Sequence, residues 1–115
     1  MTNPTYVDIK ADIGTAWSGI DGTTTTIVNS LLTKAKNKLN LITGTTTGNV
    51  QDFTIRTLSA AYAVNNVLSG LGPESVNRDN FQQMYTNFMA ETKSALMTAG
   101  YSPDGISIQF ESVNQ

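Results

Sequence analysis

The sequence contains no cysteine and no histidine among its 115 residues, and only 14% of its residues are charged. Without cysteine, the chain has no disulfides, thiolate metal sites or cysteine nucleophiles. Without histidine, it lacks the base of the usual Ser and Cys triads, the commonest zinc ligand and the main acid–base group at neutral pH. The carboxylates are scattered and form no convergent set. We therefore predict that the protein is not an enzyme and holds no metal or cofactor.

Long apolar runs are also missing, so no segment approaches the roughly 20 apolar residues that a membrane-spanning helix needs. The first residues show no basic region followed by an apolar stretch, which is the pattern of a secretory signal. The net charge is −2 and the sequence pI is about 4.8. These features predict a soluble protein without general attraction to nucleic acid or to an anionic membrane.

What the chain does contain is a large share of threonine and asparagine beside 39% hydrophobic residues. Its length suits one domain with a modest core. A surface with so few charged groups is weakly hydrated, which indicates that much of the exterior faces other protein chains.

Four segments show helical periodicity, which predicts a small all-α domain over residues 1–101, with one short helix followed by three longer ones. The expected helices are a short one from Thr5 to about Ser18, a second from Ile27 to Gly44, a third that follows Asn49 and reaches Gly70, and a fourth from Asn77 or Asp79 to Gly100.

The second segment carries apolar residues at four-residue intervals, which predict its buried face: Ile27, Leu31, Ala35 and Leu39, with Val28, Leu32 and Ile42 widening that face. Three lysines cluster in its second half: Lys34, Lys36 and Lys38. Positive charge there complements the carboxyl end of a helix. Two interpretations stay open, a solvated face near the helix end and a contact with phosphate or an acidic partner.

Three residues of the helical part are candidate subunit contacts, namely Trp17, Arg56 and Tyr62. Trp17 also fits an ordinary core or interface aromatic. Arg56 lies among Thr and Ser positions and fits a solvent-facing role equally well. Arg56 and Tyr62 belong to the third segment, whose apolar residues occupy most of its circumference. A helix of that kind is covered on several sides.

Residues 102–115 differ from everything before them, because Ile106, Ile108 and Phe110 alternate with polar residues. A period of two is typical of a strand with one buried face. A lone strand needs a partner for its backbone groups, and no second stretch of this kind is evident. We predict an extended C-terminal arm whose three apolar residues are buried by a different chain. The alternative is a frayed terminus with chance alternation.

The order of these segments resembles the head-to-tail connector proteins of tailed bacteriophages, the adaptor family that docks beneath the portal ring. The resemblance covers roughly residues 5–100. It rests on "IVNSLLTKAKNKLNLITG", with its apolar and alanine pattern around Leu32 and Ala35, and on the alanine-rich "IRTLSAAYAVNNVLSG" with Tyr62. The family usually opens the second helix with acidic residues, where this chain has threonines.

The resemblance implies a structural subunit that forms a homo-oligomeric ring, commonly of twelve copies, between the portal protein and the next neck or tail protein. DNA would pass through the ring only as cargo, and the arm would reach the portal or a neighbouring subunit. The subunit would be made in the host cytoplasm and end in the neck of the virion. The alternative is a free cytosolic helical-bundle regulatory or ligand-binding protein, with a pocket near Tyr62 and Tyr85.

Overall fold

A computed structural model of the chain describes residues 4–13, 24–69 and 78–102, and these ranges contain four helices and no strand. The helices are α1 (Tyr6–Ile13), α2 (Thr24–Thr43), α3 (Asn49–Ser69) and α4 (Arg78–Thr98). The predicted all-α class, with one short and three longer helices, is confirmed. Residues 103–115 of the predicted arm lie outside the described ranges.

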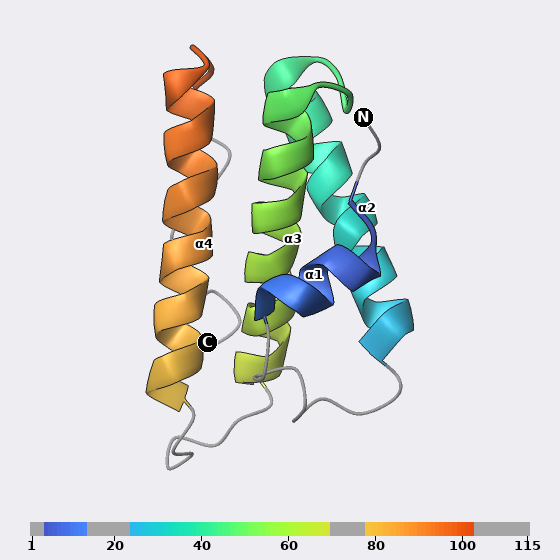
Figure 1. The fold of residues 1–115 in the computed structure, drawn as a ribbon, viewed down its shortest axis with the longest axis vertical. Helices are drawn as coiled ribbons and strands as arrows, with labels where there is room; N and C mark the ends of the chain where they lie inside the picture. The colour runs from blue at the N-terminus through green and yellow to red at the C-terminus, as the bar shows by residue number, and fades with distance from the viewer. Residues whose placement is uncertain (1–3, 14–23, 70–77, 103–115) are drawn as a thin grey trace.

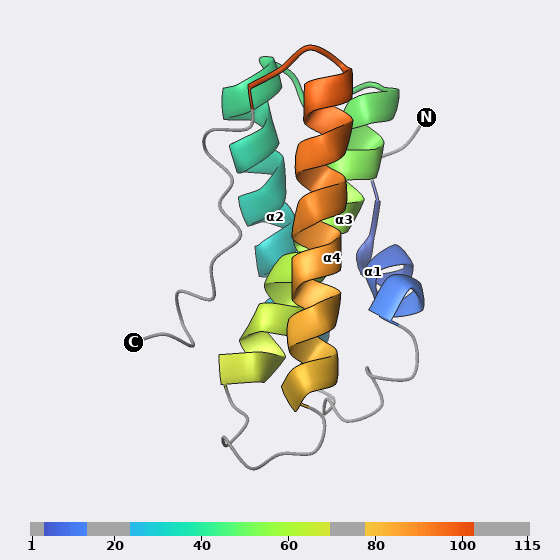
Figure 2. The ribbon, with the colours of Figure 1, turned by 90° about the vertical axis from the view of Figure 1, so that its left-hand side faces the viewer.

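The three long helices stand side by side, with α3 between α2 and α4 (Figures 1 and 2). Each runs antiparallel to the helix before it, so α2 and α4 point in the same direction. The short α1 crosses one face of the bundle and contacts both α3 and α2. The helix α3 is therefore covered from three sides, as its apolar circumference predicts.

The start of α1 and the ends of α2 and α4 form where the sequence predicts them, whereas the predicted end of the first helix near Ser18 lies outside the described residues. At the start of α1, the Thr5 N–H donates to Asp8 Oδ2 at 2.9 Å, which is one half of a capping box. The last turn of α2 closes on Gly44, whose N–H donates to the Asn40 carbonyl and whose φ is +83°. That left-handed conformation costs glycine little, so the chain can leave the helix there.

The end of α4 is a Schellman motif built on Gly100. The Tyr101 N–H donates to the Leu96 carbonyl at 2.9 Å and the Gly100 N–H donates to the Met97 carbonyl at 3.0 Å. Gly100 has a φ of +91°, and the Tyr101 ring packs back against the core. The predicted stop at Gly100 is confirmed.

The core joins all four helices into one apolar cluster. Its most deeply buried larger apolar side chains are Ile9, Val28, Leu39, Ile55, Leu58, Val64, Leu68 and Leu96. Three alanines of α3 are buried with them, Ala60, Ala61 and Ala63. Small side chains on the central helix let its neighbours approach closely, which explains why α3 carries so many of them.

The interface between α3 and α4 contains a buried pair of hydroxyl groups. Thr57 Oγ1 and Thr92 Oγ1 lie 2.5 Å apart, and Thr92 is fully buried. Because each hydroxyl has one proton, the short contact fits Thr92 donating to the Phe88 carbonyl at 2.8 Å and Thr57 donating to Thr92, with the Thr54 carbonyl 3.3 Å from Thr57 Oγ1. This pair fixes the register of α3 against α4, because a shift of either helix would leave a buried hydroxyl without its hydrogen-bond partner.

The buried face of α2 lies within the predicted one but is centred nearer to one of its edges. Val28, Leu32, Ala35 and Leu39 are buried, whereas Ile27 is 36% exposed and Leu31 is only partly buried. The helix is therefore rotated toward Val28 and Leu32, which the sequence placed at the edge of the apolar face. Spacing alone could not choose between two overlapping apolar rows on one helix.

Candidate interaction surfaces

Six residues are predicted from the sequence as subunit contacts or as the apolar residues of the arm, and the structure describes two of them, Arg56 and Tyr62. The other four lie outside the described ranges: Trp17, Ile106, Ile108 and Phe110. The candidate surfaces are therefore built from the helices α1 to α4.

Arg56 lies on the face of α3 that α1 crosses, and it binds two carboxylates of α1. Its guanidinium makes a bidentate contact with Asp12, with Nε 2.5 Å from Oδ2 and Nη2 2.7 Å from Oδ1. A third nitrogen, Nη1, lies 3.9 Å from Asp8 Oδ1. Asp8 and Asp12 are one helical turn apart, so both reach the same arginine. Arg56 therefore fastens α1 to α3.

The hydrogen bonds to Asp12 raise the pKa of Arg56 above its ordinary value, and the two negative charges add to this effect. Partial burial opposes the rise without cancelling it. The guanidinium is thus charged wherever the protein is folded. Because 41% of the Arg56 side chain stays exposed, its outer edge still faces solvent beside α1.

Tyr62 is half-buried and packs toward α2 rather than into open solvent. The Lys34 Nζ lies 4.6 Å from the centroid of its ring, within the range of a cation–π contact. Tyr85, the other ring of the predicted alternative pocket, is 4% exposed within the core. The two tyrosines are therefore used in packing.

A stripe of exposed and half-buried residues runs along the outside of α2, and we call it the α2 stripe. It consists of Ile27, Leu31, Lys34, Lys38 and Leu41. These positions follow spacings of four and three, so they share one side of the helix. Leu41 is 81% exposed and Ile27 is 36% exposed. The stripe has apolar ends and a basic middle.

The lysines of α2 lie outside its last turn, which contains no basic residue. The field of a helix end acts mainly within that turn. Complementing the carboxyl end of the helix therefore explains them poorly. Because α2 also contains no acidic residue, its lysines leave this helix with an unbalanced positive charge.

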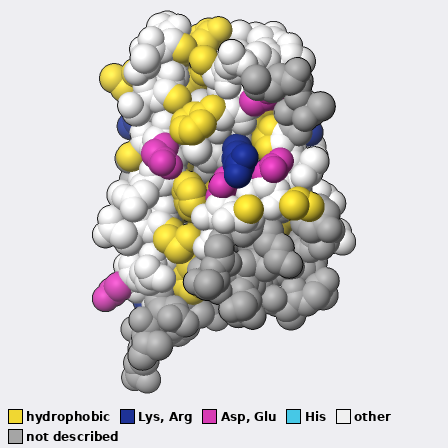
Figure 3. Space-filling model, viewed as in Figure 1, with side chains coloured by type: hydrophobic (Ala, Val, Ile, Leu, Met, Phe, Trp, Pro, Cys, Tyr) yellow, Lys and Arg dark blue, Asp and Glu magenta, His cyan; other side chains and the backbone are white. Residues whose placement is uncertain are grey.

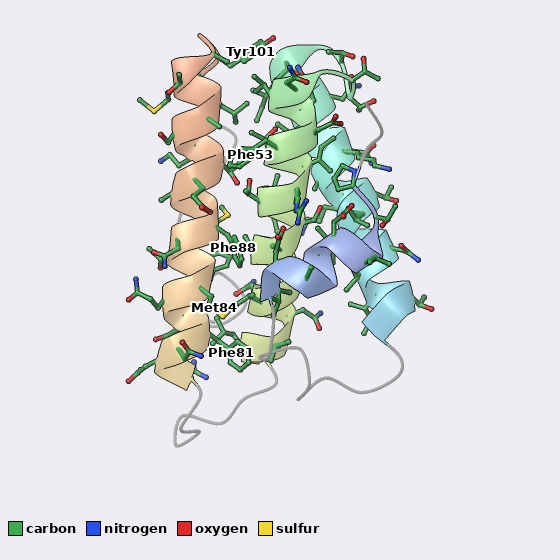
Figure 4. All side chains as sticks on the ribbon, viewed as in Figure 1. Phe53, Phe81, Met84, Phe88 and Tyr101 are labelled. Atoms are coloured by element: carbon green, nitrogen blue, oxygen red, sulfur yellow. The ribbon has the colours of Figure 1, made fainter. Side chains whose placement is uncertain are left out.

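A second apolar surface follows the line where α3 and α4 meet, on the face that carries α1. We call it the α3–α4 seam and define it by Phe53, Met84 and Phe88 (Figure 4). Phe53 is 47% exposed, and Met84 and Phe88 are partly buried. A strip of hydrophobic surface runs down this line in the space-filling view (Figure 3).

The charge beside the seam is mainly acidic. Glu91 is exposed and lies three residues after Phe88, on the same flank of α4. Asp8 and Asp12 lie on the other side around Arg56. Acidic side chains surround one basic patch in the middle of this face, and other basic side chains show only at its edges (Figure 3). The seam is therefore apolar with an acidic border.

The outer surface of α4 also has a hollow of about 370 Å³, lined by Ala90, Lys93, Ser94, Met97 and Thr98. It is open to solvent, and its lining side chains offer one charge and two hydroxyls. Met97 is 61% exposed there, whereas Met89 of the same helix is 3% exposed within the core.

In the described ranges, no three side chains with metal-binding groups come together. None of the four described helices combines the length and the apolar content that crossing a bilayer requires. No protein-family model, no curated protein and no solved structure matches this chain.

Sequence reasoning missed the α3–α4 seam. Phe53 belongs to a helix that is apolar on nearly every side, so its own pattern does not show which side stays open. The signal that was available is Glu91, because an acidic residue three positions after Phe88 marks the edge of the covered face of α4.

Proposed function

We propose that the protein is a structural subunit of a phage neck, which assembles into a ring beneath a portal and joins the capsid to the tail. The observation that carries the proposal is a small helical domain with two separate surfaces that hold exposed apolar side chains, the α2 stripe on α2 and the α3–α4 seam where α3 and α4 meet. A subunit inside a ring needs two such surfaces, one for each neighbour.

The low charge of the chain supports the same proposal. Only 14% of the residues are charged, and four large apolar side chains of the described residues are at least 47% exposed: Val7, Leu41, Phe53 and Met97. Scattered apolar residues are ordinary on a protein surface, but apolar rows along helices are typical of contact sites. In this proposal, Ile106, Ile108 and Phe110 of the arm bind a neighbouring chain by adding a strand.

The proposal also assigns DNA the role of passing cargo. The net charge of −2 gives the subunit no general attraction for the phosphate backbone. A ring of such subunits would let DNA slide through, because it offers few cations to hold it.

The test compares the full chain with a variant that ends at Ser102, using the portal protein encoded in the same genome. The full chain should sediment with portal rings, and the shortened chain should keep its helical circular dichroism but stay in the supernatant. Loss of folding in the shortened chain would instead place the arm within its own domain.

A second measurement examines the particle itself. Peptides of this chain should appear in the mass spectrum of purified virions, in a stoichiometric amount relative to the portal. Virions that contain portal and tail but no trace of this chain would overturn the proposed function.

A further inference from the structure

The α2 stripe and the α3–α4 seam match one another in length. Ile27 and Leu41, at the two ends of the stripe, are 14 residues apart, or about 21 Å along a helix. On the seam, Met84 lies eight residues before Thr92, and Phe53 lies four residues before Thr57 on the antiparallel helix. Thr57 and Thr92 touch, so they lie at the same height along the bundle. Met84 lies about 12 Å from that height in one direction and Phe53 about 6 Å in the other, so the seam extends over about 18 Å.

The two surfaces also match in the order of their chemistry. When Ile27 is set beside Met84, Lys34 comes level with Glu91, because each lies seven residues further along its helix. Leu41 then reaches the level of Phe53. Apolar side chains meet at both ends, and opposite charges meet in the middle.

The direction of the helices allows this register in a ring. It requires α2 of one copy to run parallel to α4 of the next. Within one subunit α2 and α4 already point the same way (Figure 1). Rotation about a ring axis parallel to the helices keeps that direction, so every subunit can repeat the same contact.

From these matches we propose that copies of this chain associate head to tail, with the α2 stripe of one copy lying on the α3–α4 seam of the next. The contact pairs Lys34 with Glu91 between two apolar ends. It identifies the subunit interface of the ring in the proposed function, and its biological role rests on that function. The physical contact needs only two copies of the chain.

The absence of cysteine makes a direct test possible, because introduced cysteines have no background. In the proposed register, Lys38 lies level with Ala95, and replacing these two residues leaves the Lys34–Glu91 pair and both apolar ends intact. The variants Lys38→Cys and Ala95→Cys are mixed in equal amounts at about 1 mM and oxidised. The disulfide-linked dimers are then sorted by mass spectrometry.

The mixed dimer is expected to exceed the half share of all dimers that random collision gives. The matched control is Ser94→Cys, which is exposed and lies one residue away but points about 100° further round α4. Lys38→Cys mixed with Ser94→Cys should give the random distribution. Mixed dimers no more frequent than in the control, or an excess of like-with-like dimers, overturn the head-to-tail contact.

A charge exchange supplies the second measurement. Adding Lys34→Glu to the Lys38→Cys chain should lower the yield of mixed dimer by up to about fivefold. Adding Glu91→Lys to the Ala95→Cys partner should then restore it, because the pair is rebuilt with its signs exchanged. A mixed-dimer yield that stays the same after both substitutions also contradicts the contact.

The two proposals fail in different ways. A chain that cross-links as expected but does not bind the portal keeps this contact and loses the proposed function. A chain that binds the portal without the Lys38 to Ala95 preference keeps the function and loses the contact.

Discussion

At the scale of single residues, the structure separates side chains that hold the fold from those that are free to bind. Thr57 and Thr92 show the first kind, because their hydroxyls meet inside the α3–α4 interface. Leu41 shows the second kind, because it is 81% exposed although Leu39, two residues before it on the same helix, is fully buried. Burial, rather than residue type, decides which substitutions change stability.

The hydroxyl pair gives a sharp prediction. Thr92→Val keeps the shape of the side chain but removes one hydroxyl, so the free energy of unfolding should fall by about 1 kcal/mol. In the double variant Thr57→Val with Thr92→Val, the loss should be smaller than the sum of the two single losses, since no buried hydroxyl is left without its partner. Urea denaturation of the four proteins measures this. Strict additivity would show that the two hydroxyls are not coupled.

Arg56 gives a second residue-scale prediction. A double-mutant cycle with Arg56→Met and Asp12→Ala should yield a coupling free energy of about 0.5–1 kcal/mol, because the contact is bidentate but partly exposed. The coupling should shrink in about 0.5 M salt. A coupling unchanged by salt would argue that the two side chains interact through packing.

The pKa of Arg56 determines how this contact depends on pH. A raised pKa in the folded state contributes stability below the ordinary pKa of the group, and this stability is lost only as pH rises through the raised value. For arginine that range is strongly alkaline. Titration of Arg56 should therefore leave the stability of the protein constant between pH 5 and 9, as thermal melting of the wild type against Arg56→Met can show.

At the scale of elements, residues at the helix ends determine where a helix begins and where it stops. Asp8 and Gly100 are typical start and stop residues, and both function as such in the structure. The lysines of α2 show the opposite case. They resemble a helix-end signal in the sequence, but α2 continues to Thr43, so the lysines lie before its last turn and interact little with the field of the helix end.

Gly100 allows a prediction about the end of α4. A methyl group built on Gly100 meets nothing within 4 Å, so Gly100→Ala adds no clash and pays only for its φ of +91°. The expected loss is about 1 kcal/mol, or a fall in Tm of roughly 4–8 °C. Gly100→Asn should lose less, since asparagine tolerates the left-handed region better. Equal losses for alanine and asparagine would contradict this origin of the effect.

At the scale of the whole molecule, the three long helices and the crossing α1 form one core, while the α2 stripe and the α3–α4 seam keep apolar side chains exposed. In the proposed assembly these two surfaces are the subunit contacts, which leads to a prediction that separates folding from association.

Leu41→Ser should change the free energy of unfolding by less than about 0.5 kcal/mol, since Leu41 is 81% exposed, and Phe53→Ser should cost about 1 kcal/mol, since about half of that side chain is buried. Both should nevertheless weaken self-association. The matched control is Leu39→Ala, two residues away from Leu41 and fully buried, which should cost about 2–5 kcal/mol. Chemical denaturation measures the first quantity and sedimentation velocity the second. A large loss of stability in Leu41→Ser would show that the stripe belongs to the core.

The sequence by itself determined the helical class, the number of helices and most of their ends. These depend on local chemistry: spacing of apolar residues, caps such as Asp8, and glycines such as Gly44 and Gly100 that adopt a positive φ. Local signals of this kind act within one or two helical turns, so they can be read without knowing what lies across the domain.

Only the tertiary structure decided which apolar residues the core uses. Ile27 and Val28 are equivalent in type and adjacent in the chain, yet Val28 is 1% exposed and Ile27 is 36% exposed. The rotation of α2 depends on its packing against α3 and α1, and the pairing of Arg56 with Asp12 joins residues 44 positions apart. Contacts of that range arise from the arrangement of the helices in space, because no local pattern fixes which neighbour a helix face will meet.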